Sequence, residues 1–301
     1  MISNGYHTPV LLEESIEGLS VRPDGTYVDL TYGGGGHSRE ILKQLTSGTL
    51  IAFDQDPAVK PHLISDRRFV FVQHNYRYLK NYLDYMGISA VDGILADLGV
   101  SSRHLDDPGR GFSFRFDAPL DMRMNPAQAE SAADLANSLD DAALKRIFAN
   151  YGELNQPGRL ATRLADARRE RPVKTTGDLA GIFEPILPAN RKNKMLAQIF
   201  QAFRIAVNHE MESLEVMLSQ TPQLVRQGGR LVVISYHSLE DRLVKNFIRA
   251  GNADGRLETD FFGNPIAPFK AINRKVTIPD TDEATANPRA RSAKLRIAER
   301  N

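Results

Sequence analysis

The stretch TYVDLTYGGGGHSREIL, residues 26 to 42, places four consecutive glycines between a strand-like run and a helix-like run. Such a run adds maximal conformational entropy to the unfolded chain, so a folded protein needs a local reason to keep it. The sequence therefore predicts a tight turn at the carboxyl end of a buried strand. It also indicates that something approaches the backbone of this turn very closely.

Strand-like and helix-like segments alternate through the first third of the chain. Strands are expected within residues 26–32, 48–56, 68–75 and 91–100, and helices within 7–19, 38–45 and 76–87. Alternation at this spacing is typical of βαβ units and a parallel sheet. A strand within 227–237, a helix after it and two weaker strands in the tail resume the pattern.

Between residues 103 and 190 the sequence shows no convincing strand. It predicts a long loop, then several helices, then one long helix over about residues 193 to 220. We therefore expect an α/β domain interrupted by an all-helical insertion. The expected first part spans 1–102, the inserted substrate-binding domain 103–215 and the second part 216–301.

Composition excludes several classes of chemistry. The 301 residues carry a net charge of +1, which gives no global indication for or against nucleic acid. Cysteine is absent, which excludes disulfides, cysteine-ligated zinc, iron–sulfur clusters and a thiolate nucleophile. No metal site is predicted. The chain shows no signal peptide and no membrane-spanning run, so we expect a cytoplasmic protein.

The glycine turn does not fit a dinucleotide site. That fingerprint needs glycine at the sixth position, and counting from Gly33 or Gly34 gives Ser38 or Arg39. A Walker loop is also absent. The spacing fits S-adenosylmethionine better, because an acid and small residues alternate after the first strand: Asp29, Thr31, Gly33 and Gly35.

A second acid for the ribose hydroxyls is expected after the second strand, and Asp54 lies there. The methionine carboxylate would suit the start of the following helix, at His37, because free N–H groups and the helix dipole favour an anion. Taken singly, the glycines could be a tight turn and Asp54 a helix cap. Their combined register with two strands favours S-adenosylmethionine binding.

Asp97 ends the fourth strand, where ligands of parallel sheets usually bind. A carboxylate there could accept a hydrogen bond from an exocyclic amine, turn its lone pair toward a methyl donor and help remove the proton. A loop-capping aspartate is the alternative. The covalent cysteine route to cytosine C5 is excluded, so nitrogen and oxygen targets remain.

The segment ISYHSLEDR ends the next strand, and its polar residues His237, Ser238 and Asp241 would face the same crevice if that strand neighbours the fourth. Ser238 could equally cap the next helix, with Asp241 as its third residue. His237 is either a site residue or a buried structural imidazole.

Two features indicate a nucleic acid target. Between residues 159 and 194, nine basic residues stand against four acidic ones, which suggests phosphate contacts, although a solvated helix face explains such runs equally well. The tail adds a second basic stretch, NPRARSAKLRIAER. The loop aromatics Phe112, Phe114 and Phe116 could stack an unpaired base or simply belong to a core.

Over essentially its whole length the chain resembles the MraW family of bacterial 16S ribosomal RNA cytosine-N4 methyltransferases. The resemblance rests on HTPVLLEE, GGGGHS, DLGVSS, RGFSFRFDAPLDMRM, FQAFRIAVNHE, GGRLVVISYHSLEDR and NPRARSAKLR. It implies a Rossmann-like methyltransferase domain with an inserted helical domain and S-adenosylmethionine as donor. The implied acceptor is N4 of a decoding-centre cytidine in 16S ribosomal RNA or the small subunit.

The resemblance also implies site residues. The family's cofactor positions match Gly35, Gly36, His37, Asp54, Tyr76, Asp97 and His104, and we expect Asp97 and His237 to be catalytic. His104 stands where the family usually has glutamine. Ala118 and Asn125 replace an expected glycine and aspartate, within an otherwise intact motif.

The rival functions are an amino-methyltransferase acting on DNA or protein, and a non-catalytic RNA-binding assembly factor. No membrane partner is expected, and the sequence leaves open whether the chain forms a homodimer.

Overall fold

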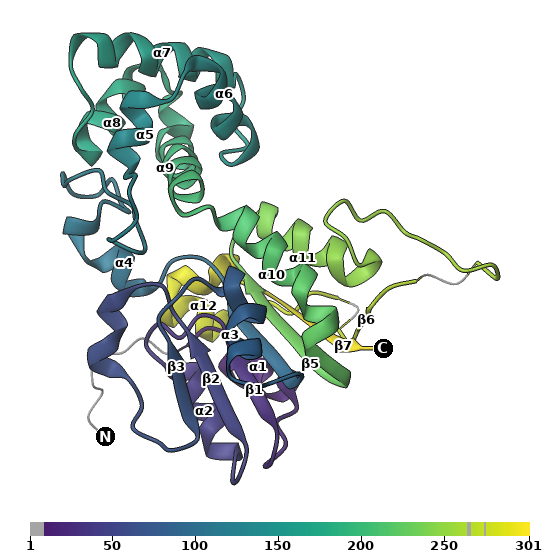
Figure 1. Cartoon of the computed structure of the whole chain (residues 1–301). Helices are drawn as coiled ribbons and strands as arrows, with labels where there is room; N and C mark the ends of the chain where they lie inside the picture. Colours follow the sequence, from purple (N-terminus) through teal and green to yellow (C-terminus); the bar gives the residue numbers. More distant parts are fainter. Residues whose placement is uncertain (1–8, 264–265, 274) are drawn as a thin grey trace. The chain divides into compact units, whose positions relative to one another are not determined.

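In a computed structural model, residues 9–263, 266–273 and 275–301 are described. The chain forms two compact units, Met1–Gly99 with Met211–Asn301 and Val100–Glu210 (Figure 1). The first is an α/β unit and the second is helical. None of the helices in the described ranges is both long and apolar enough to span a membrane.

The α/β unit is built on a seven-stranded sheet in the order β3-β2-β1-β4-β5-β7-β6. Its strands are β1 (Thr26–Asp29), β2 (Thr49–Phe53), β3 (Phe69–Val72), β4 (Val91–Asp97), β5 (Val225–Ser235), β6 (Phe269–Ala271) and β7 (Lys294–Arg300). The first five are parallel, whereas β7 pairs antiparallel with β5 and with β6. This confirms the predicted α/β fold and places β5 beside β4.

Helices cover both faces of this sheet. On one face, Val28 and Ile94 pack against α3, α10 and α11, and on the other Tyr27 and Leu95 pack against α1 and α2. Neighbouring strand residues thus point to opposite cores, as expected of a sheet buried on both sides. The helices are α1 (Leu12–Leu19), α2 (Gly36–Gln44), α3 (Leu79–Tyr85), α10 (Glu210–Leu224, within this unit from Met211), α11 (Ser238–Ala250) and α12 (Thr281–Ala286).

Two predicted helices differ from the structure. The first begins only at Leu12, because Leu11 adopts a left-handed conformation with φ of 49°. The long helix expected over 193–220 is two helices, α9 and α10, since His209 has φ of 49° and ends α9. A residue in the left-handed conformation cannot continue a right-handed helix. The spacing of apolar residues does not predict where such a residue occurs.

The helical unit contains α4 (Ser102–Asp106), α5 (Ala132–Ser138), α6 (Asp141–Asn150), α7 (Pro157–Glu170), α8 (Thr176–Phe183) and α9 (Lys192–Asn208). Its core includes Phe148, Phe183 and Phe203, whose rings meet edge to face. From Val100 to Glu210, where every backbone position is described, the only β pairing is one bridge between Pro119 and Thr175. The predicted absence of strands is therefore confirmed.

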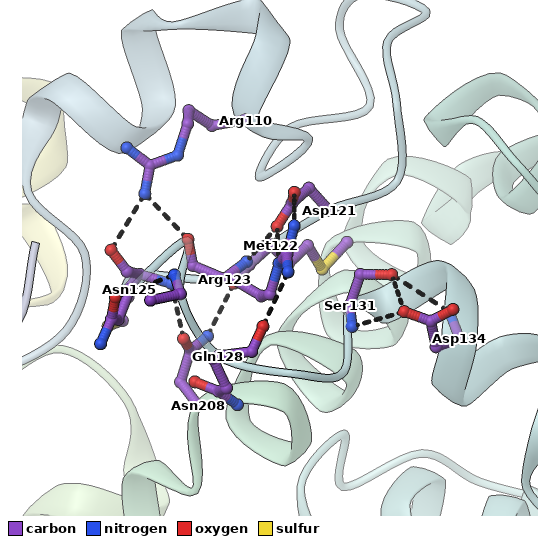
Figure 2. A network of polar contacts seen from close by, with 11 residues as sticks. Arg110, Asp121, Met122, Arg123, Asn125, Gln128, Ser131, Asp134 and Asn208 are labelled. Carbon is purple, nitrogen blue, oxygen red and sulfur yellow. Dashed lines mark hydrogen bonds and ion pairs between the residues drawn. The ribbon is translucent and has the colours of Figure 1, made fainter.

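A polar network holds the loop that precedes α5 in one conformation (Figure 2). Arg110 donates to the carbonyl oxygens of Arg123 and Met124, at 2.8 and 3.0 Å. Arg123 in turn forms a two-pronged pair with Asp121. Buried Asn208, at the end of α9, accepts from the Met124 N–H and donates to the loop carbonyl at position 122.

Candidate active site

Three carboxylates lie at the carboxyl ends of three neighbouring parallel strands. Asp29 ends β1, Asp54 follows β2 and Asp97 ends β4. Because β1 lies between β2 and β4, the three acids gather at one edge of the sheet. This edge is where ligands bind in open α/β folds.

The glycine turn connects β1 to α2. Gly33 and Gly35 have φ of 52° and 72°, which side chains other than glycine rarely adopt. A Cβ at Gly35 would lie 2.6 Å from the hydroxyl of Tyr32, and one at Gly36 would collide with the ring of Pro9. The chain's own side chains thus account for the close approach at Gly35 and Gly36 that the sequence indicated.

Asp29 is hydrogen-bonded to residues on both sides of this turn. Its carboxylate accepts from the Ser38 hydroxyl at 2.6 Å and from the Thr31 N–H at 3.1 Å. Only 1% of the residue is exposed, and this burial raises its pKa despite the hydrogen bonds from Ser38 and Thr31. Asp29 therefore fixes the start of α2 and does not face a ligand directly.

Asp54 is held in a fixed orientation. One oxygen accepts from the Gly33 N–H at 2.8 Å and the other from the Asp56 N–H at 2.9 Å. These two hydrogen bonds fix the plane of the carboxylate just beyond β2. The bond to Gly33 also ties the second strand to the glycine turn.

The surroundings of Asp97 shift its pKa upward. Its Oδ1 accepts from the Tyr236 hydroxyl at 2.7 Å, and its backbone N–H donates to the Thr31 hydroxyl at 2.7 Å. The side chain is 24% exposed. Burial raises the pKa of Asp97 to about 6, against the lowering effects of His37 and the Tyr236 hydrogen bond. Within the described residues, Oδ2 receives no hydrogen bond, so it is available to a substrate.

His37 lies in the first turn of α2, with 5% of the residue exposed. Its Nε2 is 3.2 Å from the Val10 carbonyl, and its Nδ1 is 4.0 Å from Asp97 Oδ2, beyond hydrogen-bonding distance. Burial lowers its pKa, although Asp97 opposes the shift. A neutral ring that donates from Nε2 to Val10 fits these contacts.

Tyr236, rather than His237, reaches Asp97. Burial and the neighbouring Asp97 carboxylate raise the pKa of Tyr236 far above its usual value, so its hydroxyl stays protonated and donates. The imidazole of His237 instead caps α11, with Nδ1 accepting from the Glu240 N–H at 3.4 Å and Nε2 lying 3.1 Å from Glu240 Oε1. The catalytic role predicted for His237 stays a prediction.

The cap of α11 is one residue earlier than the sequence suggested, since His237 and Glu240 form the capping box rather than Ser238 and Asp241. Asp241 instead pairs with two basic side chains of β7, Lys294 at 3.2 Å and Arg296 at 2.7 Å. Asp241 therefore joins α11 to β7.

The remaining predicted cofactor residues lie in different units. Tyr76 begins a 3₁₀ turn, Tyr76–Tyr78, and packs in part against the core of the α/β unit. His104 belongs to the helical unit, where it forms a capping box with Ser101 and stacks on Phe112 at 4.9 Å. The cofactor contact predicted for His104 stays a prediction.

The three loop phenylalanines have different environments. Phe112 is buried, Phe114 packs against Phe200 at 5.2 Å, and Phe116 is 57% exposed. Two of the three thus serve the helical core, and Phe116 alone is open enough to contact a base.

The two departures from the family motif fit the loop. The backbone N–H of Ala118 donates to the hydroxyl of Thr176 at 3.1 Å. Asn125 accepts from the Ala127 N–H at 3.0 Å, a turn that aspartate would make equally well.

The geometry fits S-adenosylmethionine. Asp54 places a carboxylate, a group suited to ribose hydroxyls, beside the glycine turn. Gly35 is the N-cap residue of α2, which has no side-chain cap and no acid in its first turn, so the start of this helix favours a carboxylate. Asp97 offers a free oxygen at the neighbouring strand end. With the sheet order, these features define a Rossmann-like methyltransferase.

Comparison with known proteins gives the family. The model of the MraW methylase family matches residues 4–301, and the chain belongs to this family. A protein of Parabacteroides distasonis named Ribosomal RNA small subunit methyltransferase H is 55% identical, over 98% of this chain and 97% of its own length. Proteins of the same name from Bacteroides thetaiotaomicron and Flavobacterium johnsoniae are 53% and 51% identical, each over 98% of this chain and 97% and 98% of their own lengths. Membership confirms the predicted class, an S-adenosylmethionine-dependent methyltransferase.

Proposed function

We propose that the protein methylates the N4 amine of a decoding-centre cytidine in 16S ribosomal RNA. Relatives at 50–55% identity carry the name of a small-subunit ribosomal RNA methyltransferase. The absence of cysteine leaves nitrogen and oxygen as targets on a base. The motif blocks shared with the cytosine-N4 enzymes favour nitrogen.

The observation that carries this proposal is the state of Asp97. Tyr236 orients one carboxylate oxygen, and the other receives no hydrogen bond from the described residues. With a pKa of about 6, the group is mostly ionised at neutral pH, so it can accept a hydrogen bond from an amine N–H. That bond would rotate the amine about its C–N bond, so that its lone pair leaves conjugation with the ring and turns toward the methyl group. The same carboxylate would take the proton once nitrogen acquires its fourth bond.

S-adenosylmethionine supplies a methyl group on a sulfonium, and the chain's role is to hold donor and amine in line. Asp54 would accept from the ribose hydroxyls, the turn from Gly35 to His37 would hold the methionine end, and Tyr76 would lie beside the adenine. His104 would add a polar contact from the helical unit. His237, through Glu240, would keep the backbone at Tyr236 in place, since Glu240 accepts from the Tyr236 N–H at 2.8 Å.

The test is transfer of a labelled methyl group. Purified protein would be offered unmethylated small subunits, naked 16S RNA, DNA and bulk protein, and the product mapped by mass spectrometry. We expect label on one cytidine of the RNA or the subunit, as N4-methylcytidine, and labelling at least about a hundredfold slower with the Asp97→Asn variant. Label on DNA or protein alone would support a different acceptor, and failure to bind the donor would favour a non-catalytic assembly factor.

A further inference from the structure

The helical unit contains a cavity of about 200 Å³ that the proposed methyl transfer does not use. Its lining comes from the residues around the start of α7, from the segment between α8 and α9, and from the first turn of α9. This volume far exceeds the ~30 Å³ that one water molecule occupies in the liquid. The cavity can therefore hold a sizeable chemical group.

The chemistry of the cavity wall is divided. Two guanidinium groups, those of Arg159 and Arg191, line it together with the side-chain amides of Asn155 and Gln156. The remainder is apolar, contributed by Leu160, Ile186, Leu187, Pro188 and Met195. None of the lining residues is acidic, so the two positive charges are not neutralised from within the cavity.

The contacts of the other arginines in the basic stretch set these two apart. Arg163 and Arg168 donate to the carbonyl oxygens of Ile182 and Ala136. Arg169 and Arg171 pair with acids at 2.9 and 3.2 Å, namely Asp166 and Asp178. These four arginines already have partners within the helical unit.

The side chains of the two cavity arginines have fewer or longer polar contacts with the rest of the helical unit than those of the other four. Arg159 makes only a 3.5 Å contact, with Gln156. Among the described residues, no acid pairs with the side chain of Arg191. Their guanidinium groups are therefore free to bind an anion from outside.

The backbone at the cavity also favours an anion. Gln156 is the N-cap residue of α7, in a left-handed conformation with φ of 59°, and its side chain does not cap the helix. No acid occupies the first turn of α7, whereas α5, α6 and α8 each have both a capping side chain and a first-turn acid. The positive end of the α7 dipole thus adds to the charge of Arg159.

We infer that this cavity binds one unpaired nucleotide of the substrate RNA, away from the methylated base. The arginine pair contacts the phosphodiester, since guanidinium matches phosphate oxygens in geometry and charge. The apolar floor receives the base or ribose, and the two amides bond a base edge. This inference rests on the proposed function and identifies a further binding site for its substrate.

The experiment compares the Arg159→Gln/Arg191→Gln double variant with the wild type. The RNA is the form that accepts methyl groups from the wild type, and binding is measured over a series of salt concentrations. We expect about tenfold weaker RNA binding and a salt dependence less steep by ~1.4 in log–log slope, about 0.7 for each lost contact with single-stranded RNA. KM for RNA should rise about tenfold, while kcat and the affinity for S-adenosylmethionine stay unchanged.

The matched control is Arg169→Gln/Arg171→Gln, which removes the same charge from exposed arginines that already pair with acids. It should leave the salt slope and KM unchanged. The Arg159→Lys/Arg191→Lys variant should retain most of the salt slope, because lysine keeps the charge.

Three results would overturn the inference. One is wild-type RNA affinity in the Arg159→Gln/Arg191→Gln variant, and another is an equal loss in the control variant. The third is weakened binding to small subunits with unchanged binding to naked RNA that the wild type methylates, which would point to a ribosomal protein as the occupant. If the wild type methylates no RNA at all, the proposed function fails first and this inference fails with it.

Discussion

At the scale of single residues, Asp97 combines two demands that oppose each other. The proposed catalysis needs an ionised carboxylate near the target, whereas burial opposes the charge and raises the pKa of Asp97 to about 6. We predict that Asp97→Asn lowers turnover about 10²- to 10⁴-fold, the range for a positioned acid–base group. The measurement is single-turnover methyl transfer with saturating donor. Turnover within threefold of the wild type would remove Asp97 from the mechanism.

The same substitution should stabilise the protein. A carboxyl group whose pKa is higher in the folded than in the unfolded chain costs stability above that pKa, and the cost vanishes below the unfolded value near 4. Asp97→Asn should therefore be up to about 3 kcal/mol more stable than the wild type at pH 8, since each pKa unit corresponds to about 1.4 kcal/mol. The difference should disappear near pH 4. Urea unfolding at both values measures it, and a pH-independent difference would contradict it.

Tyr236 gives a pH test of the proposed chemistry. The wild-type rate should fall as pH drops through about 6, because protonated Asp97 no longer accepts from the amine. The Tyr236 hydroxyl lowers the pKa of Asp97, so Tyr236→Phe should move this acid limb to higher pH and reduce the rate at pH 7 about tenfold. Profiles of kcat/KM for both proteins would show it. An unmoved limb would mean that Tyr236 has only a packing role.

The sequence predicts the position of a site residue best where that residue directly follows a strand. Asp54 and Asp97 could be placed because the carboxyl ends of adjacent parallel strands meet at one edge. The sequence does not predict the contact between Tyr236 and Asp97. Whether Tyr236 or His237 points toward Asp97 depends on the path of the backbone after β5 and on the capping box that His237 forms with Glu240. The one available signal was that β5 neighbours β4, which brings a tyrosine just beyond Ile234 level with Asp97.

At the scale of elements, the start of α2 shows that its glycines serve the fold, besides the donor contact proposed for them. An alanine Cβ at position 36 would overlap Pro9, the residue beside Val10, whose carbonyl contacts His37. We predict that Gly36→Ala destabilises the protein by about 1–3 kcal/mol even without cofactor, as overpacking typically does.

Thermal unfolding of the cofactor-free protein measures the effect of Gly36→Ala. The matched control is Gly181→Ala, a helical glycine of α8 with no atom within 4 Å of an added Cβ, which should be neutral or slightly stabilising. Unchanged stability of Gly36→Ala, with weakened donor binding, would show that this glycine serves the ligand alone.

The loop before α5 depends on one buried amide of α9 (Figure 2). Asn208 accepts from the Met124 N–H at 2.7 Å and donates to the Met122 and Arg204 carbonyls at 2.8 and 2.9 Å. Asn208→Ala leaves these buried groups unsatisfied, and we predict a loss of about 2–4 kcal/mol.

Amide hydrogen exchange should report the consequence of Asn208→Ala at Met124, whose N–H would lose its acceptor. Asn193→Ala serves as the control, because Asn193 lies on the exposed face of the same helix. Equal exchange at Met124 in the wild type and Asn208→Ala would mean that the loop is held by other contacts.

Element boundaries were harder to predict than element types. The apolar spacing that predicted one helix over 193–220 continues across His209, yet the backbone reverses hand there. The helix expected within residues 76–87 ends beside Gly87 as predicted, because glycine adopts positive φ readily. Leucine and histidine rarely adopt positive φ, so the sequence gives no local signal for the helix ends at Leu11 and His209.

At the scale of the whole molecule, strand alternation predicted the parallel part of the sheet because each βαβ unit is local in sequence. The antiparallel β7, with Leu295 paired to Ile234 of β5, joins residues far apart in the chain. No local pattern fixes such pairing. The insertion was recognisable because its apolar spacing changes from that of strands to that of helices, and it builds a core of its own.

Separate cores lead to a prediction about unfolding. The helical core and the two cores flanking the sheet consist of different side chains, and all proposed donor contacts except His104 lie in the α/β unit. We predict two calorimetric transitions, and S-adenosylhomocysteine at 100 times its dissociation constant should stabilise the α/β unit by ~2.7 kcal/mol. The transition of the helical unit, identified by its response to Asn208→Ala, should move much less. A single transition, or equal shifts of both, would show that the helical unit takes part in donor binding, and His104 would then be the first residue to substitute.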